Sequence, residues 1–246
     1  MLPFLKKYRE GRRPRCAALV AAAGSSTRMG GGTNKLLLPL DGIPVLIRTL
    51  DALQRAERVD EIIVATREEE LVEIAQLCHT YGITKCKKVV RGGESRAHSV
   101  MLAALEADKS MELLAVQDGA RPLVTPELID SVIAAAARCG AAAPAVPVKD
   151  TIKVVGTDGI VTATPERSTL MAVQTPQIFT AELLKQAYAH LAAHPAAVTD
   201  DASVVELMGH KVATALGRYE NIKITTPEDL LFAENLLAQQ EQEDGK

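Results

Sequence analysis

The sequence of 246 residues contains no Trp and few other aromatic residues, with three Phe and four Tyr. Proteins that bind single-stranded nucleic acid stack bases on aromatic side chains, so this composition disfavours that class. Acidic and basic residues nearly balance, with 31 Asp and Glu against 28 Lys and Arg, which disfavours a surface that coats nucleic acid. The core must therefore be built from Ala, Val, Leu and Ile, and nucleic acid is not expected as a partner.

Cysteine is also scarce: Cys16, Cys78, Cys86 and Cys139 form no C-x-x-C pair. A chain of this length does not need disulfides, so we expect a reducing, cytoplasmic setting. No apolar run approaches the ~18 residues of a membrane span. Residues 1–15 are basic and lack the apolar segment of a secretory signal, so we interpret them as a poorly ordered basic leader.

The remaining composition is that of a globular protein, with 47% hydrophobic and 24% charged residues. As far as residue 146, short apolar segments alternate with amphipathic ones, which is typical of strands and helices in turn. This rhythm predicts an α/β fold, Rossmann-like, with a mostly parallel twisted sheet flanked by helices. The expected strands are residues 17–22, 61–65, 88–90, 112–117 and 142–146, and the expected helices begin at Pro44 or cover 68–79, 95–107 and 126–138.

The rhythm changes after residue 147. Residues 148–155 and 160–163 are rich in β-branched side chains, and the connection Gly156-Thr157-Asp158-Gly159 between them suits a hairpin. We therefore predict a projecting β-hairpin arm at about residues 148–168. The other expectations are strands at 170–174, 212–216 and 222–225, helices at 181–191, 201–208 and 227–239, a single domain over 16–240, and a polar tail at 241–246.

The strongest functional signal follows the first expected strand, in the sequence Ala22-Ala23-Gly24-Ser25-Ser26-Thr27-Arg28, with Lys35 further on. Small residues at the carboxyl end of a buried strand let backbone N–H groups approach an anion, and Arg28 and Lys35 would add positive charge. The spacing fits neither a Walker phosphate loop nor the dinucleotide fingerprint. A plain Gly/Ser surface loop is the alternative.

Polar motifs follow several later strands. Asp118 comes directly after a buried strand, where a carboxylate can face Mg²⁺ on a triphosphate or can cap a turn. Arg121 can present a two-pronged donor to a phosphate, or can be a solvated surface arginine. The motifs are Gly92-Gly93-Glu94-Ser95-Arg96-Ala97-His98-Ser99-Val100, Asp118-Gly119-Ala120-Arg121-Pro122, Pro147-Val148-Lys149-Asp150-Thr151, Gln174-Thr175-Pro176-Gln177, Thr199-Asp200-Asp201-Ala202-Ser203 and Asn221-Ile222-Lys223-Ile224-Thr225.

In this order, the motifs resemble the nucleotidyltransferase superfamily and, within it, the 2-C-methyl-D-erythritol 4-phosphate cytidylyltransferase family, over about residues 16–240. The resemblance implies the nucleotidyltransferase fold and the transfer of a cytidylyl group from CTP to that polyol phosphate. It also implies Mg²⁺ or another divalent cation, and a homodimer that exchanges the arm. Two departures are Asn34, where many members have Pro, and Gln117, where many have His.

The resemblance also implies roles for individual residues. Arg28, Lys35 and Lys223 would be catalytic and hold the triphosphate, and Asp118 would organise the metal or the substrate. Two of these roles have plain structural alternatives. Arg96 can instead support its own loop, and Lys223, as a single lysine in a strand, would ordinarily face solvent. The implied nucleotide-binding residues are Ala22, Ala23, Gly24, Ser25, Ser26, Thr27, Gly93, Arg96, Ser99 and Asp118, and the implied acceptor-binding residues are Arg121, Thr151, Arg167, Thr175 and Thr199.

Other functions stay open at this point. A cytidylyltransferase for another polyol phosphate, such as ribitol 5-phosphate, would share the CTP site, and a sugar-nucleotide pyrophosphorylase would use a different base. A non-catalytic protein that senses CTP is disfavoured, because sensing does not require Arg28, Lys35, Asp118 and Lys223 together. Hydrolases with an activated serine or a zinc-binding helix are disfavoured because their motifs are missing.

Overall fold

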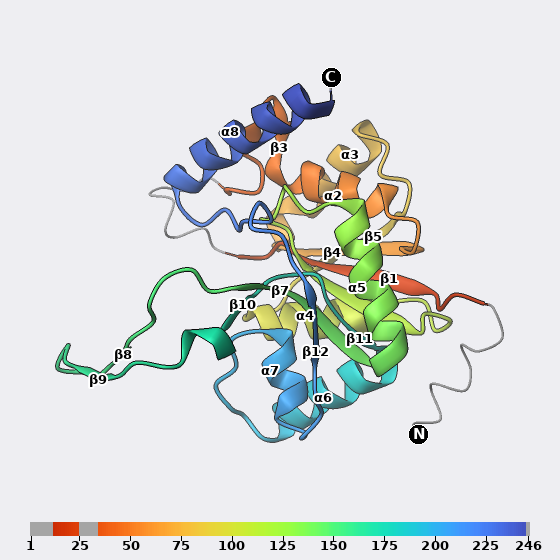
Figure 1. Ribbon diagram of the computed structural model, residues 1–246. Helices are drawn as coiled ribbons and strands as arrows, with labels where there is room; N and C mark the ends of the chain where they lie inside the picture. Colours follow the sequence, from red (N-terminus) through yellow and green to blue (C-terminus); the bar gives the residue numbers. More distant parts are fainter. Residues whose placement is uncertain (1–11, 25–33, 245–246) are drawn as a thin grey trace.

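A sheet of eight strands forms the centre of the computed structural model, which describes residues 12–24 and 34–244 (Figure 1). The strand order is β10-β7-β11-β6-β1-β4-β5, with β12 paired to β7. Only β10 and β11 run antiparallel to their neighbours, so the predicted mainly parallel sheet is confirmed. The strands are β1 (Cys16–Ala21), β4 (Glu61–Thr66), β5 (Cys86–Arg91), β6 (Leu113–Asp118), β7 (Ala141–Pro147), β10 (Met171–Val173), β11 (Gln177–Thr180) and β12 (Ala213–Leu216).

Helices cover both faces of this sheet. Strand β1 shows why, because Ala18 and Val20 pack into one core and Ala17 and Leu19 into the other, and all four are almost fully buried. One face carries α2 (Val45–Arg55), α3 (Leu71–Thr80), α5 (Pro126–Cys139) and α8 (Pro227–Asp244), and the other carries α4 (Arg96–Glu106), α6 (Ala181–Ala193) and α7 (Asp201–Glu206).

The limits of α5 follow from local chemistry. Thr125 caps its first turn by accepting a hydrogen bond from the N–H of Leu128, and Pro126 occupies the first helical position. Gly140 ends the helix with a φ of 88°, a conformation that suits glycine, and its N–H donates to the carbonyl of Ala136. Both ends lie within two residues of the prediction.

Two segments differ from the prediction. Residues 177–180 were not predicted to form a strand, yet β11 inserts there between β6 and β7. The expected strand at residues 222–225 was wrong, because the structure describes this segment in full and gives it no strand. Its backbone instead bonds to the loop after β6, where the N–H of Ile224 donates to the carbonyl of Ala120 at 2.8 Å. A short unpredicted hairpin, β2 (Pro39–Leu40) with β3 (Ile43–Pro44), precedes α2.

The arm is a two-stranded hairpin of β8 (Val154–Val155) and β9 (Val161–Ala163) that projects from the body of the molecule (Figure 1). Its strands are shorter than predicted, since residues 148–153 form no strand. Apolar side chains on the arm are exposed, including Val155 at 52% and Ile160 at 63%. Such exposure is unusual for a segment that has no partner.

The described parts of both termini pack against the body of the molecule or continue a helix. Arg12 pairs with Glu112 and Arg13 with Asp60, each at 2.7 Å, and residues 1–11 of the expected basic leader lie outside the described residues. Helix α8 continues through most of the expected polar tail, as far as Asp244. Among the described residues, no helix has the length and apolar character needed to cross a membrane.

Candidate functional site

A cavity of about 400 Å³ opens at the carboxyl ends of β1 and β6. These ends meet because the two strands are parallel neighbours, with Ala21 opposite Asp118. The predicted residues Ser25, Ser26, Thr27 and Arg28 lie outside the described residues. The described lining is Ala21, Ala23, Gly24, Lys35, Leu36, Gly93, Glu94, Ser95, Arg96, Ser99, Asp118, Ala120, Lys223 and Thr225.

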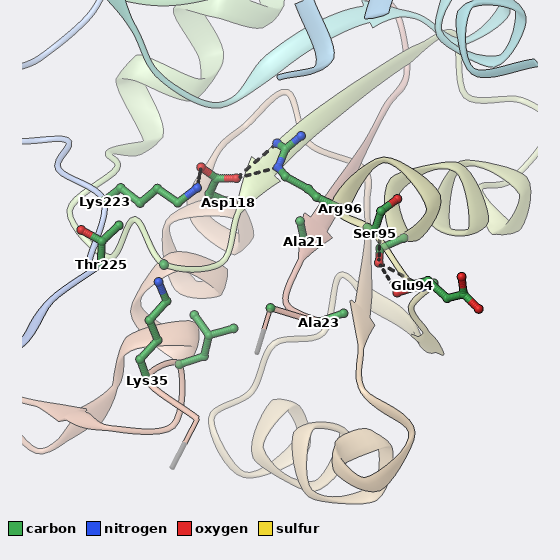
Figure 2. A pocket seen from close by; sticks show the side chains of 14 residues that line it. Ala21, Ala23, Lys35, Glu94, Ser95, Arg96, Asp118, Lys223 and Thr225 are labelled. Carbon is green, nitrogen blue, oxygen red and sulfur yellow. Dashed lines mark hydrogen bonds and ion pairs between the residues drawn. The ribbon is translucent and has the colours of Figure 1, made fainter. Parts of the chain in front are cut away.

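Two lysines from distant parts of the chain line this cavity (Figure 2). The ammonium group of Lys35 donates to the carbonyl of Ile224 at 2.7 Å. That of Lys223, one residue earlier, lies 3.0 Å from the carboxylate of Asp118. The contact of residues 222–225 with the loop after β6 therefore brings both positive charges to one wall, and Lys223 does not point away into solvent.

Asp118 is surrounded by cations. Its carboxylate lies 3.2 Å from Arg96, 3.0 Å from Lys223 and 3.5 Å from Arg121. Burial alone would raise the pKa of Asp118, but these three positive charges outweigh it and hold the pKa at about 2. The carboxylate is therefore ionised at neutral pH, and a cluster of one anion and three cations forms the floor of the site.

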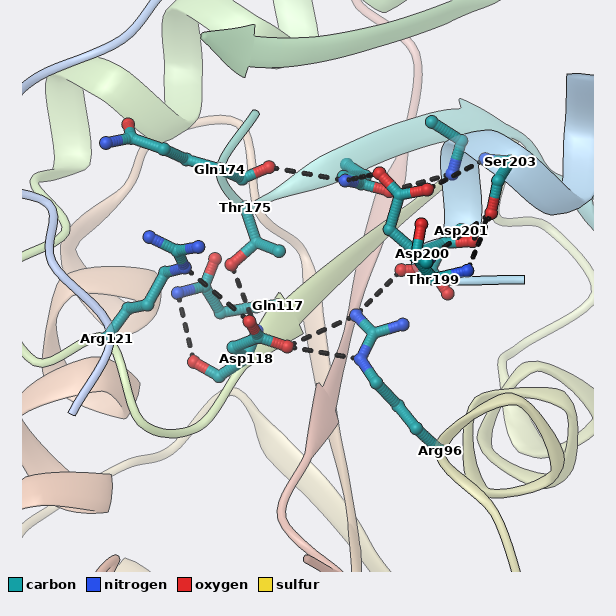
Figure 3. Close-up of polar contacts among 12 residues, drawn as sticks. Arg96, Gln117, Asp118, Arg121, Gln174, Thr175, Thr199, Asp200, Asp201 and Ser203 are labelled. Carbon is teal, nitrogen blue, oxygen red and sulfur yellow. Dashed lines mark hydrogen bonds and ion pairs between the residues drawn. The ribbon is translucent and has the colours of Figure 1, made fainter. Parts of the chain in front are cut away.

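Arg96 bridges two carboxylates (Figure 3). One is Asp118, and the other is Asp201, which is fully buried and lies 2.8 Å away. The hydroxyl of Tyr188 donates to Asp201. Burial alone would lower the pKa of Arg96, but Asp201 and Asp118 raise it. Arg96 thus joins Asp118 at the end of β6 to Asp201 at the start of α7, and its side chain also lines the cavity.

A loop that begins at Gly92 forms the far wall. The N–H of Gly93 donates to the hydroxyl of Ser99 at 3.0 Å, and that hydroxyl donates to the carbonyl of Ser95. A side chain at Gly93 would lie 2.2 Å from the ring of His98, so only glycine fits. Ser99 is 2% exposed, and its hydroxyl shapes the backbone of this wall. Ala22, also predicted to bind nucleotide, instead extends the β1–β4 pairing and is fully buried.

A second cavity, of about 170 Å³, adjoins the first and shares Arg96, Asp118 and Lys223 with it. Three of the predicted acceptor residues, Arg121, Thr175 and Thr199, line it. The hydroxyl of Thr175 accepts a hydrogen bond from the N–H of Asp118 at 3.1 Å, which joins the two motifs directly (Figure 3).

The other two predicted acceptor residues lie elsewhere. Thr151 and Arg167 line neither cavity, and both lie within the segment of the projecting arm. The guanidinium of Arg167 donates to the carbonyl of Lys149 at 2.9 Å. Within one chain, therefore, the structure does not bring these two residues to the site.

Polar residues that were not among the predicted site residues lie in or beside the second cavity: Gln174, Gln177 and Asp200 line it, and the buried Asn221 lies beside them. The amide of Asn221 donates to the side chain of Gln174 at 3.2 Å and to the carbonyl of Thr175 at 3.0 Å. Gln177 donates to Asp200 at 2.8 Å and so fixes the start of α7. These residues, and Asp201, lie within the motifs at residues 174–177, 199–203 and 221–225. Their position next to the predicted site residues is the sequence signal that could have identified them.

The residues present fit a divalent cation only in a limited way. Among residues 12–24 and 34–244, no group of three His, Cys, Asp or Glu side chains is placed to hold a metal ion. Asp118 is the buried carboxylate on the cavity wall, and Mg²⁺ is commonly held by one or two carboxylates together with substrate phosphates. The donor set therefore suits an ion that is bound mainly by a triphosphate.

A mainly parallel sheet with a cationic cavity at the carboxyl ends of β1 and β6 agrees with the nucleotidyltransferase class that the motifs resemble. The comparisons with known proteins narrow this further. Residues 16–239 match the model of the 2-C-methyl-D-erythritol 4-phosphate cytidylyltransferase family, and the chain belongs to that family.

Curated relatives and solved structures agree with this family. The chain is 44% identical to the 2-C-methyl-D-erythritol 4-phosphate cytidylyltransferase of Alkaliphilus metalliredigens, over 90% of this chain and 92% of that protein. It is 46% identical to that of Caldanaerobacter subterraneus, over 90% and 98%. The crystal structure of 4-diphosphocytidyl-2C-methyl-D-erythritol synthase from Anaerococcus prevotii matches with a TM-score of 0.81 and 33% identity, over 92% of this chain and 99% of that one. The resemblance stated from the motifs is confirmed.

Proposed function

We propose that this enzyme transfers the cytidylyl group of CTP to 2-C-methyl-D-erythritol 4-phosphate, giving 4-diphosphocytidyl-2-C-methyl-D-erythritol and pyrophosphate. A phosphate oxygen of the acceptor attacks the α-phosphorus of CTP, and the bond from that phosphorus to pyrophosphate breaks. The observation that carries this proposal is the pair of adjoining cavities with Arg96, Asp118 and Lys223 in common. One cavity suits the nucleotide and the other the acceptor, so the reacting groups meet at the shared wall.

Repulsion between two anions is the main obstacle to this reaction. Phosphoryl-type transfer depends mostly on positioning and on neutralising charge, with little covalent chemistry for the protein to supply. A phosphate monoester has a second pKa of ~6, so the acceptor is already ionised and needs no general base. This agrees with a described site rich in Arg and Lys.

The triphosphate is held in this proposal by Lys35 and Lys223, which line the larger cavity, and by Arg28, assigned from the sequence alone. The loop of Gly93 and Ser99 faces the base. Asp118, together with the phosphates, would hold Mg²⁺ or another divalent cation, which would supply additional shielding of negative charge. Lys223 is placed to exchange its contact with Asp118 for one with a phosphate, because its side chain remains 39% exposed.

The acceptor is held by Arg121, Thr175 and Thr199 of the same chain. Thr151 and Arg167 complete its pocket from a second subunit, so the active form in this proposal is a homodimer that exchanges its arms. Support comes from the exposed apolar side chains of the arm, which projects from the body of the molecule (Figure 1), and from the absence of Thr151 and Arg167 from both cavities of the same chain. An apolar surface of this kind is stabilised when a partner covers it.

A panel of substrates tests the activity. Purified protein is incubated with CTP, UTP or ATP and with 2-C-methyl-D-erythritol 4-phosphate or ribitol 5-phosphate, and pyrophosphate release is measured. We expect turnover only with CTP and 2-C-methyl-D-erythritol 4-phosphate. Turnover with ribitol 5-phosphate in its place would assign the acceptor differently, and turnover with UTP or ATP alone would assign another base. CTP binding without any turnover would contradict an enzymatic function.

Mixed dimers test the contribution of the arm. Alone, Arg167→Ala is expected to raise KM for the acceptor and to leave KM for CTP unchanged, and Lys35→Ala is expected to be nearly inactive. If the arm acts in the partner's site, one site of each mixed dimer is free of both substitutions. At an acceptor concentration far below the raised KM of Arg167→Ala, co-expression of the two variants should then restore about a quarter of wild-type activity after random pairing. Activity no higher than the mean of the two variants would contradict arm exchange.

A further inference from the structure

Glu70 is a buried carboxylate that the proposed reaction does not use. It ends the 3₁₀ turn η3 (Glu68–Glu70) and is 5% exposed. Three side chains donate to it: Asn34 at 2.8 Å, Thr66 at 2.9 Å, and Arg67, with which it also forms an ion pair. Burial would raise the pKa of Glu70, but the hydrogen bonds from Arg67, Asn34 and Thr66 lower it, so Glu70 is a fixed acceptor at neutral pH.

One of these donors stands next to a catalytic lysine. Asn34 directly precedes Lys35 and is 4% exposed. While its amide nitrogen donates to Glu70, its amide oxygen accepts a hydrogen bond from the N–H of Leu36 at 3.0 Å. The side chain of Asn34 therefore holds the main chain on both sides of Lys35, and it anchors that stretch to the end of β4.

The same anchor reaches the opposite wall of the nucleotide cavity. Thr66 is the last residue of β4, and its hydroxyl donates to Glu70. The carbonyl of Thr66 accepts a hydrogen bond at 2.7 Å from the N–H of Gly92, where the loop of Gly93 begins. Through Glu70, two segments that line the cavity are thus joined to one buried carboxylate.

The direction of the main chain at Lys35 decides where its ammonium group can reach. A lysine has a long flexible side chain, and a displacement of about 1 Å at a reacting group can cost on the order of 100-fold in rate. In this structure the ammonium group is directed along the cavity wall to the carbonyl of Ile224. Without the hydrogen bonds of Asn34, the main chain at Lys35 would no longer be held in one position, and the ammonium group would no longer be directed at one point of the cavity.

We propose that Asn34 and Glu70 are positioning residues for nucleotidyl transfer, whose buried hydrogen bond fixes the main chain at Lys35 and so aims its ammonium group at the triphosphate. This inference rests on the proposed function, because Lys35 matters to catalysis only if the cavity holds CTP. It predicts that loss of the hydrogen bond lowers kcat and leaves KM for the acceptor unchanged.

Two substitutions of Asn34 test this. Asn34→Ala removes the donor, and Asn34→Asp keeps the size but sets a second carboxylate against Glu70. Both are expected to lower kcat, Asn34→Ala by about 10-fold and Asn34→Asp by about 100-fold. The matched control is Glu69→Gln, whose side chain is 67% exposed and contacts the same Arg67 at 3.6 Å, and it should retain wild-type kcat. Unchanged kcat in both Asn34 variants would overturn the proposal.

Reversing the hydrogen bond separates positioning from folding. Combining Asn34→Asp with Glu70→Gln exchanges donor and acceptor, and we expect it to recover at least 10-fold in kcat over Asn34→Asp alone. Recovery of thermal stability without recovery of kcat would mean that the pair is structural only, and would overturn the proposal. If neither kcat nor thermal stability recovers, the coupling between Asn34 and Lys35 distinguishes positioning from folding.

A double variant measures the coupling between Asn34 and Lys35. If Asn34 acts through Lys35, adding Asn34→Ala to Lys35→Ala should cause no further fall in kcat. An undiminished fall of about 10-fold in the double variant would overturn the inference. Wild-type kcat in Lys35→Ala alone is a different outcome, since it would contradict the proposed function of the cavity itself.

Discussion

Replacing Lys35 with alanine is expected to lower kcat by about 100- to 1000-fold, the loss that follows removal of one preorganised transition-state donor. Its ammonium group lines the nucleotide cavity, and charge on the triphosphate redistributes as pyrophosphate leaves. The substitution removes little acceptor binding, because Lys35 does not line the second cavity. Initial rates of pyrophosphate release at varied acceptor concentration measure both kcat and KM.

A matched control and a second variant sharpen this test. Lys87 is exposed and lies outside both cavities, so Lys87→Ala should retain wild-type kcat. Arg28→Ala is expected to resemble Lys35→Ala, on the basis of the sequence alone. Near-wild-type turnover of Lys35→Ala would show that the triphosphate does not bind at this wall.

Replacing Asp118 with asparagine is expected to destabilise the folded protein by about 3–5 kcal/mol, the loss typical when one partner of a buried ion pair is removed. Arg121 is 11% exposed at its side chain, and Asp118 is the carboxylate that compensates its charge. Arg96 keeps Asp201 as a partner, whereas Lys223 can turn toward solvent. Urea unfolding at pH 7 of the wild type and the variant measures the difference in free energy.

The pH dependence of unfolding gives an independent check on Asp118. Its pKa is about 2 in the folded protein against an ordinary value of 3.8. A lowered pKa means that the stabilisation is complete above about pH 4 and is lost as the pH falls toward 2, a contribution of about 2 kcal/mol. Unfolding free energies measured from pH 5 to pH 2 should therefore fall more steeply for the wild type than for Asp118→Asn.

A surface carboxylate serves as the control for both measurements. Asp51 pairs with Arg55 within α2, and both side chains are at least half exposed, so Asp51→Asn should change the stability by less than about 1 kcal/mol. Equal stability of Asp118→Asn and the wild type, at pH 7 and across the acid range, would mean that the three cations do not depend on this carboxylate.

Local patterns in the sequence were sufficient for much of the fold. The apolar run at residues 17–22 predicts a strand buried on both faces, and Pro126 and Gly140 predict the limits of α5. These signals work because they are short-range: a strand needs its own apolar side chains, and a cap needs only its own first or last turn. The order of the motifs also predicted the family and directed attention to Lys35 and Asp118.

Segments whose conformation depends on neighbours were not predictable in this way. Residues 177–180 form β11 because the edges of β6 and β7 offer backbone hydrogen-bond partners on both sides. A segment of four residues is too short for its hydrophobic pattern to indicate a strand. Residues 222–225 carry the apolar spacing of a strand, yet their hydrogen bonds go to the loop after β6. In both cases the partner, and not the segment, decides the outcome.

The sequence by itself determined most of the strand and helix order, the family, and the residue types proposed to meet phosphate. Only the tertiary structure decided which buried polar and charged groups pair, because Arg96 and Asp201, or Asn34 and Glu70, come from separate segments of the chain. A buried charge is stable only beside a partner that packing delivers. That partner is a property of the folded chain, and no local pattern records it.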